Sequence, residues 1–352
     1  MNVIFSKTDF RLCKVNVCKG YPQSQTHVGI YYYNKNIYLT SSPFPCPVEN
    51  KVWIYFKAAL RKLSNGFLFP IVRGESFENP LLYIENKDER DSFQLMQSRP
   101  LMEQPDPYYG LPAFNSDPDL FIENGHLYVI NRSIFRTALN TGKKRDEYII
   151  RYYMILGQID GQRFKYLSTR LFYESNELSV SPCMTKFKGS YVIMHLCTNC
   201  YNDGTDFNSL KCAHISHIDG IYESLKWNKI NVDTSIYIPW HMSLFSYKEK
   251  LYSIVACIKR NEPYRCYQML GVFDDNLEYL KIFSTPFSEY NSYRGSAFVS
   301  GDGTFHLYST TVNEKLHGGK SIDGREIIHA QMNFDRLISK LEEYENSDSY
   351  NR

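Results

Sequence analysis

Five polar positions, each opening a similar stretch of sequence, are the first candidates for chemistry in this chain. They are Ser42, Asp117, Ser181, His241 and Arg294, and each precedes an apolar segment, a short turn and an aromatic-rich strand. A carboxylate, an imidazole and a guanidinium held together can bind an anionic group and move protons near neutral pH. Burying such groups is costly unless they are paired or used. These residue types therefore predict a functional site or, as the alternative, a structural ion pair between Asp117 and Arg294.

The spacing of the five stretches indicates what would bring these residues together. Their openings lie 75, 64, 60 and 53 residues apart. Repeats of this length with several strands each are typical of a β-propeller. The innermost strand of each blade lines the central channel of a propeller, so equivalent positions converge near its axis. The sequence thus predicts an all-β, five-bladed β-propeller with the five polar residues around one central site.

Turns and end segments complete the expected architecture. Short polar turns, such as Asn124-Gly125 and Gly301-Asp302-Gly303, separate the apolar stretches and favour one inner hairpin per repeat. The first hairpin is expected from Ser42-Pro43 to 52–55, and ring closure is expected to be shared between the N-terminal strand and the last blade. Apolar residues at helical spacing predict a short C-terminal helix over 334–344. One domain is expected over 1–352, with the propeller at about 1–332 and the helix and tail at 333–352.

Composition narrows the class of protein. The 352 residues carry 40 basic and 38 acidic side chains, a net charge of +2, so nothing favours a nucleic-acid partner. The 29 Tyr and 22 Phe suit half-buried strand faces, and some could line a sugar-binding surface. The first twenty residues contain charges and no apolar run, and the nine cysteines are odd in number. We expect a cytoplasmic protein without membrane insertion, or a virion component if the chain is phage-encoded.

Several phrases resemble a known group of enzymes. The stretch from Asn115 to Phe121, with Asp117-Pro118-Asp119 at its centre and Asn124-Gly125 after it, resembles the second-blade motif of five-bladed glycoside hydrolases of families 43 and 32/68. Ser181-Pro182, followed by Gly189 and Tyr191, resembles their third-blade motif. Pro239-Trp240-His241 and the phrase from Tyr293 to Ser296 are similar to uncharacterised propellers associated with phage and polysaccharide gene clusters.

The resemblance implies three carboxylates in the central site. These are a base in blade one, a pKa-tuning aspartate in blade two and an acid in blade three. Asp117 matches the second of these positions. The first position is occupied by Ser42, and the third by Val180. The chain therefore lacks a carboxylate at two of the three matching positions.

Other side chains could substitute for the missing carboxylates. Glu177 and Ser181 are an even number of residues apart and would share one face of a strand, so Glu177 could act as an acid beside Asp117. The alternative is a solvated residue at the strand end. Glycosidic cleavage needs carboxyl groups about 5–5.5 Å apart for retention or about 6.5–9.5 Å apart for inversion. His241 could be a base or a histidine hydrogen-bonded across blades.

Two functions follow from these residues. The first is a glycoside-hydrolase-like protein that acts on a microbial poly- or oligosaccharide. Its catalytic candidates are Asp117, Glu177 and His241, and its candidate substrate contacts are Ser42, Asp119, Ser181, Trp240, Tyr293 and Arg294. The second is a catalytically inactive propeller that binds glycan, as a phage particle component or a capsule- or exopolysaccharide-cluster accessory protein. No cofactor is expected for either.

One further group has the composition of a zinc site. Cys197 and Cys200 form a C-x2-C pair, and Cys212, His214 and His217 follow. A typical structural zinc site has two tight pairs of ligands, whereas the second half of this group is irregular. Free thiols on an outer strand are therefore expected here in place of a metal ion.

Overall fold

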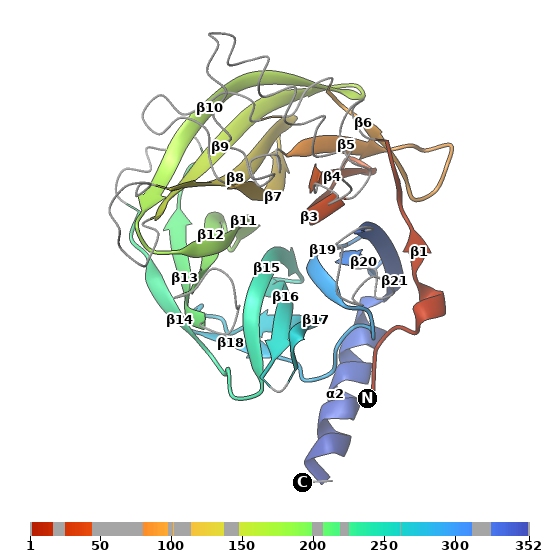
Figure 1. Cartoon of the computed structure of the whole chain (residues 1–352). Coiled ribbons are helices and arrows are strands. Elements are labelled where there is room, and N and C mark those ends of the chain that lie inside the picture. The colour runs from red at the N-terminus through yellow and green to blue at the C-terminus, as the bar shows by residue number, and fades with distance from the viewer. Residues whose placement is uncertain are drawn as a thin grey trace, which may run out of the picture.

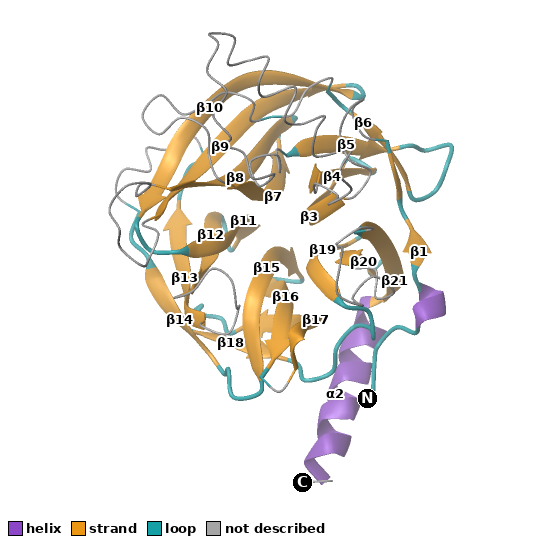
Figure 2. Cartoon of the chain, in the orientation of Figure 1, coloured by secondary structure: helices purple, strands orange, loops and turns teal. Residues whose placement is uncertain are grey.

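The computed structural model describes residues 2–16, 25–43, 80–97, 101, 114–136, 148–198, 207–218, 225–260, 262–311 and 325–350. Within these residues the strands form antiparallel groups that follow one another around a ring, as Figure 1 shows. We call each group a blade and number the blades along the chain. Figure 2 shows how little of the described chain lies outside strands, apart from one long helix at the C-terminal end. The predicted all-β propeller is confirmed.

The blades have these strands in the described part of the chain. Blade 1 contains β3 (Gln25–Tyr33), β4 (Asn36–Pro43), β5 (Leu81–Glu85) and β6 (Ser92–Leu95). Blade 2 contains β7 (Phe114–Glu123), β8 (His126–Arg136), β9 (Tyr148–Asp160) and β10 (Arg163–Ser175). Blade 3 contains β11 (Ser179–Phe187), β12 (Ser190–Thr198), β13 (Phe207–Ile215) and β14 (Asn228–Val232). Blade 4 contains β15 (Tyr237–Tyr247), β16 (Lys250–Lys259), β17 (Glu262–Phe273) and β18 (Tyr279–Ile282). Blade 5 contains β19 (Ser292–Val299), β20 (Thr304–Thr311) and β21 (Glu326–Asn333).

The N-terminal segment closes the ring, as the sequence predicted. After a short 3-10 turn, η1 (Lys7–Asp9), strand β1 (Arg11–Leu12) pairs antiparallel with β21 of blade 5. Strand β2 (Lys14–Val15) then pairs parallel with β6 of blade 1. At the closure Asp91 accepts hydrogen bonds from Arg11 Nε (2.5 Å) and His329 Nδ1 (2.5 Å), and His329 Nε2 lies 3.1 Å from His306 Nδ1.

The inner strands β3, β7, β11, β15 and β19 contact one another in this order, and β19 contacts β3. Two-residue turns join the inner strand to the next one in several blades. Asn124 and Gly125 have φ of 51° and 76°, and Lys188 and Gly189 have φ of 47° and 80°. Positive φ at both central positions matches the right-handed twist of the flanking strands. The expected inner hairpins after Asp117 and Ser181 are therefore present.

Apolar side chains between neighbouring blades form the core. Phe121 of blade 2 packs with Tyr191 and Ile193 of blade 3, and similar clusters lie between the other blades. The C-terminal helix α2 (Phe334–Tyr350) runs farther than the predicted 334–344. Its buried Phe334 and Leu337 extend the cluster between blades 4 and 5. No helix of the described chain is long and apolar enough to cross a membrane.

Candidate functional site

The inner strands share a bulge near their first residues. His27-Val28, Asp117-Pro118, Ser181-Pro182 and Tyr293-Arg294 each lie opposite a single residue of the next strand, and β15 has a smaller irregularity at Trp240. His27, Asp117 and Ser181 have φ of 55°, 54° and 54°, in the left-handed region. Bulges redirect side chains out of the regular alternation of a strand. The repeated bulge therefore turns residues of different blades toward one another at one end of the ring.

The first blade corrects one sequence-based expectation. Ser42 does not open an inner strand, because it lies in β4 and pairs with Thr26 of β3. The residue at the bulge of the inner strand is His27. Ser42 is fully buried beside the central site, and the expected partner segment 52–55 lies outside the described residues. The blade-one position of the site is thus an imidazole and not a hydroxyl.

Asp117 is the centre of the site and is fully buried. Its Oδ2 lies 2.9 Å from a terminal nitrogen of Arg132 and accepts the backbone N–H of Ser181 at 3.1 Å. Its Oδ1 lies 2.9 Å from His27 Nε2 and 3.5 Å from His241 Nδ1. The two oxygens have different surroundings, since one is held by a cation and an amide and the other lies between two imidazoles.

These surroundings set the charges of the centre. Burial acts to raise the pKa of Asp117, but Arg132, His27 and His241 outweigh it and hold this pKa well below its usual value. Burial lowers the pKa of His27 to about 4, although Asp117 opposes the change. Burial likewise holds the pKa of His241 well below its ordinary value. At neutral pH the centre therefore has an ionised carboxylate, offset by Arg132, and two neutral imidazoles.

Ser181 adds a hydroxyl to the centre. Its Oγ lies 2.7 Å from His241 Nδ1, the same nitrogen that faces Asp117. A Ser-His-Asp triad needs the hydroxyl and the carboxylate on opposite ring nitrogens. The arrangement is therefore not such a triad. In the described structure His241 Nε2 is buried and has no hydrogen-bond partner.

Arg294 and Asp119 link blades near the centre. Arg294 is fully buried, donates to the Pro118 carbonyl at 2.8 Å and lies 3.6 Å from Asp119 Oδ1. Asp119 Oδ2 accepts the backbone N–H of Met184 at 3.2 Å. Burial raises the pKa of Asp119 to about 6 against the opposing charge of Arg294. The alternative considered from the sequence was an ion pair between Asp117 and Arg294, whereas the structure pairs Asp117 with Arg132 and Asp119 with Arg294.

Two half-buried aromatic residues border the buried centre. The ring of Tyr293 has its centroid 5.0 Å from that of His27 and 4.5 Å from that of His241, and Arg325 lies over it at 4.3 Å. Trp240 meets the His241 ring edge-on at 5.3 Å. Both aromatic residues were sequence-based candidates, and the structure brings both to the site.

The sequence makes Glu177 a candidate partner of Asp117, but its described side-chain contacts lie within blade 3. It precedes the first residue of β11, and its carboxylate pairs with Lys211 and accepts from Asn208 at 3.3 Å. Both partners belong to β13, the third strand of blade 3. Residues alternate between faces only within a strand, so the even spacing to Ser181 does not carry Glu177 to the channel. The described contacts of Glu177 fit the alternative, a residue at the strand end.

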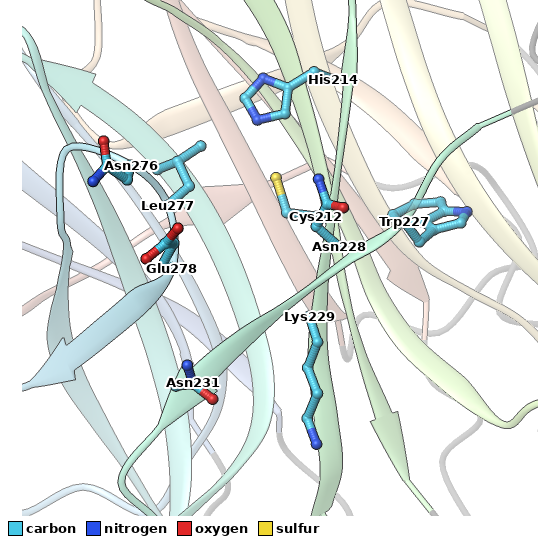
Figure 3. Close-up of a pocket in the computed structure, with 9 residues that line it drawn as sticks. All are labelled: Cys212, His214, Trp227, Asn228, Lys229, Asn231, Asn276, Leu277 and Glu278. Atoms are coloured by element: carbon cyan, nitrogen blue, oxygen red, sulfur yellow. The ribbon is translucent and has the colours of Figure 1, made fainter.

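A pocket of about 580 Å³ lies where the parallel pair β14 and β18 joins blades 3 and 4. Figure 3 shows its lining, which includes Cys212, His214 and Trp227 beside Leu277 and Glu278. Burial raises the pKa of Cys212 to about 12, so its sulfur is a thiol. Cys200 of the sequence-based cysteine and histidine group lies outside the described residues. Among the described members of that group, Cys197 and Cys212 are not in disulfides, and both are buried.

The comparisons with known proteins agree with this fold. A structure of an N-acetylgalactosamine deacetylase from F. plautii in complex with blood group B trisaccharide matches with a TM-score of 0.59 at 12% identity, over 94% of this chain and 95% of that one. A family 43 glycoside hydrolase from Xanthomonas citri complexed with xylotriose matches with a TM-score of 0.55 at 9% identity, over 88% and 87% of the two chains. The chain has the fold of the family 43 glycoside hydrolases.

The resemblance seen in the sequence is thus confirmed at the level of the fold. A xylan β-1,4-xylosidase from Bacillus halodurans also matches, with a TM-score of 0.59 at 13% identity over 90% of this chain. The match spans 54% of that xylosidase, about half its length. No protein-family model matches the chain, and no curated protein sequence does.

Sequence reasoning missed two residues of the centre, His27 and Arg132. His27 belongs to a hairpin whose turn, Asn34-Lys35, has φ of 50° and 60° but contains no glycine. Arg132 lies in β8 within the polar run Asn131-Arg132-Ser133, which interrupts an otherwise apolar strand. That interruption was the feature that could have indicated a buried polar partner for Asp117.

Proposed function

We propose that this protein is a carbohydrate-active propeller that binds a poly- or oligosaccharide where the bulged inner strands begin, and hydrolyses a bond in it at the His27–Asp117–His241 centre. The observation that carries the proposal is the convergence of side chains from separate blades on one buried carboxylate. A cluster of buried titratable groups with perturbed pKa values is a candidate functional site. The half-buried Tyr293 and Trp240 lie beside the centre, and aromatic side chains of this kind commonly line ligand sites.

The likeness to carbohydrate-active proteins supports the substrate class. The similar structures include a xylosidase, an arabinofuranosidase, a deacetylase with a bound trisaccharide and a Xanthomonas citri enzyme with bound xylotriose. The position of Glu177 argues against a pair of carboxylates formed with Asp117. We therefore assign the chemistry to the imidazole and carboxylate centre and assign Tyr293 and Trp240 to sugar binding.

The burial of the central residues favours a second candidate function, glycan binding without catalysis. Asp117, Ser181 and His241 are almost wholly covered, and Arg132 already offsets the charge of Asp117. A centre of this kind could serve only to join the blades beneath a sugar-binding face. The protein would then bind glycan without changing it.

The test uses wild-type protein, Asp117→Asn and Glu177→Gln on the same glycans. Glu177→Gln is the matched control, since it makes the same carboxylate-to-amide change outside the centre. Xylotriose, arabino-oligosaccharides and blood group trisaccharides are incubated with each protein, and binding is measured by calorimetry. Mass spectrometry then separates cleavage of a glycosidic bond from loss of an acetyl group.

Products from wild type and Glu177→Gln, but not from Asp117→Asn, are the expected result. Binding by all three proteins without product from any of them would identify the binding protein and reject hydrolysis. Neither binding nor product across a broad panel of poly- and oligosaccharides would reject the carbohydrate function itself. Circular dichroism of each variant shows that the fold is kept.

A further inference from the structure

The outer strand of blade 2 differs from the outer strands of the other blades in the described chain. Strands β6 and β21 pair on their outer sides with β2 and β1 of the N-terminal segment, and β14 and β18 pair with each other. The edges left by β1 and β2 are two residues long. Strand β10 has 13 residues, lies on the outer rim of the ring (Figure 1) and pairs only with β9 among the described strands. Its outer edge is therefore a long row of backbone groups that could accept a further strand.

Exposed apolar side chains gather on the same strand. Six large apolar side chains are well exposed in the described chain, and three of them belong to β10. They are Tyr166, Leu167 and Leu171, with exposed fractions of 54%, 44% and 44%. Proteins usually protect a long strand edge from other chains, because an exposed apolar edge is a site for pairing. These side chains therefore mark β10 as an interaction surface.

We propose that β10 pairs antiparallel with β10 of a second copy of this chain, so that blade 2 joins two chains into a two-fold dimer. A two-fold axis places the same edge of both chains in one interface, so both edges are used and the assembly closes at two chains. Addition of a strand to an open sheet edge is a recurrent mode of recognition. The proposal does not depend on the proposed carbohydrate function.

The sequence of β10 fits a two-fold pairing. In an antiparallel ladder with two-fold symmetry, one residue lies opposite its own copy. With Thr169 at that position, Leu167 of each chain lies opposite Leu171 of the other, so apolar side chains meet on both sides of the axis. Residues 168–171 pair with β9 in an unbroken register between the bulges at Leu167 and Phe172. They form a regular stretch at the centre of the proposed interface.

The charges of β10 favour the antiparallel orientation. Its first three residues include Arg163 and Lys165, and its next-to-last residue is Glu174. Antiparallel pairing places the basic end of each strand beside the acidic end of the other, whereas parallel pairing places like charges together. Glu174 remains partly exposed although it pairs with Arg151 of β9. The strand is thus complementary in charge to a second copy of itself.

Sedimentation velocity of the full-length protein over a range of concentrations measures the dimer. One strand pair is a small interface, so we expect a dissociation constant of about 1–100 µM. A double variant, Leu167→Lys with Leu171→Lys, should weaken the dimer at least about 10-fold, because lysines of the two copies would lie opposite each other. Both positions are exposed, so the fold should be kept. Tyr279→Lys is the matched control, because Tyr279 is also exposed but lies in β18, which is paired on both sides. It should leave the dimer unchanged.

Hydrogen exchange of the wild type locates the interface without variants. Amide exchange over residues 163–175 should slow at least about 3-fold between concentrations about tenfold below and about tenfold above the dissociation constant. A protein that stays monomeric at about 1 mM would overturn the inference. So would a dimer in which exchange over 163–175 does not depend on concentration, or one that the double variant leaves unchanged. None of these outcomes bears on glycan binding, which is measured separately.

Discussion

The ion pair between Arg132 and Asp117 allows a quantitative test of how the centre is held. Both side chains are buried, with 3% and 0% of their surface exposed, and the charged atoms are 2.9 Å apart. Arg132 also donates to the Ser179 carbonyl at 3.0 Å and to Ser116 Oγ at 2.8 Å. Arg132→Met keeps part of the apolar volume and removes the charge and its contacts. Removing one partner of a buried pair costs about 3–5 kcal/mol, because the other charge is left uncompensated. We expect this loss in the free energy of unfolding.

A double-mutant cycle separates this ion pair from general disruption. Asp117→Asn removes the second charge, so Arg132→Met with Asp117→Asn leaves neither charge unpaired. We expect the double variant to lose at least about 2 kcal/mol less than the sum of the single variants. Urea unfolding with linear extrapolation gives each free energy. Arg151→Met is the control from the same blade, because its partner Glu174 is 43% exposed and such pairs contribute about 0–1 kcal/mol.

The pH dependence of the same variant is a second part of the test. Burial is the main cause that lowers the pKa of His27 and His241, and the charge of Arg132 lowers both pKa values further. Without it both pKa values should rise, and a protonated imidazole can then neutralise Asp117. The cost of Arg132→Met should therefore shrink as the pH falls from neutral toward the raised pKa values of the two imidazoles. A cost below about 1 kcal/mol, or single variants that add within about 0.5 kcal/mol, would refute the conclusion that Arg132 neutralises Asp117.

Two further predictions concern stability. Burial lowers the pKa of His306 from 6.5 to about 4, so the unfolded chain takes up the proton first and stability should fall as the pH drops from about 6.5 to about 4. His306→Gln should remove up to about 3 kcal/mol of that fall, measured by urea unfolding at several pH values. An unchanged dependence of the unfolding free energy on pH would contradict the assignment of the fall to His306. Gly29→Ala should cost about 1–3 kcal/mol, because its Cβ would lie 2.9 Å from Thr40 Cγ2 and 3.1 Å from Asp119 Oδ1. Gly301→Ala, with nothing within 4 Å of its Cβ, should change stability by less than about 0.5 kcal/mol, and equal losses in the two variants would exclude crowding at Gly29 as the cause.

Much of the centre follows from the repeats in the sequence. Asp117, Ser181, His241 and Arg294 were predicted to converge, and the structure places them within one network of contacts near the starts of the inner strands. The prediction worked because the bulge and the turn of a blade are local features. Asp117-Pro118 and Ser181-Pro182 occupy the same bulge, with φ of 54° at both first residues.

The first blade shows where local features are insufficient. Ser42-Pro43 resembles the Asp-Pro and Ser-Pro pairs of the later bulges, yet it lies at the end of β4. The true bulge is at His27-Val28, where no proline marks it. Its hairpin turn uses Asn34 and Lys35 at positive φ, which asparagine tolerates well and lysine less so. The contacts with β7 and β19, which make β3 an inner strand, depend on distant residues and are not encoded locally.

Arg132 shows how a buried polar network could be found from sequence in this fold. Its neighbours in β8 include the fully buried Ile130 and Ile134, so the run Asn131-Arg132-Ser133 between them cannot face solvent. Buried polar groups require hydrogen-bond partners. The nearest residues outside the regular strand pairing are those of the bulge on the preceding strand. Asn131 lies opposite that bulge, and Arg132 reaches Asp117 within it. A polar run in the second strand of a blade, aligned with a bulge in the first, therefore predicts which cation meets the central carboxylate. The Arg132→Met cycle tests this rule as well as the ion pair.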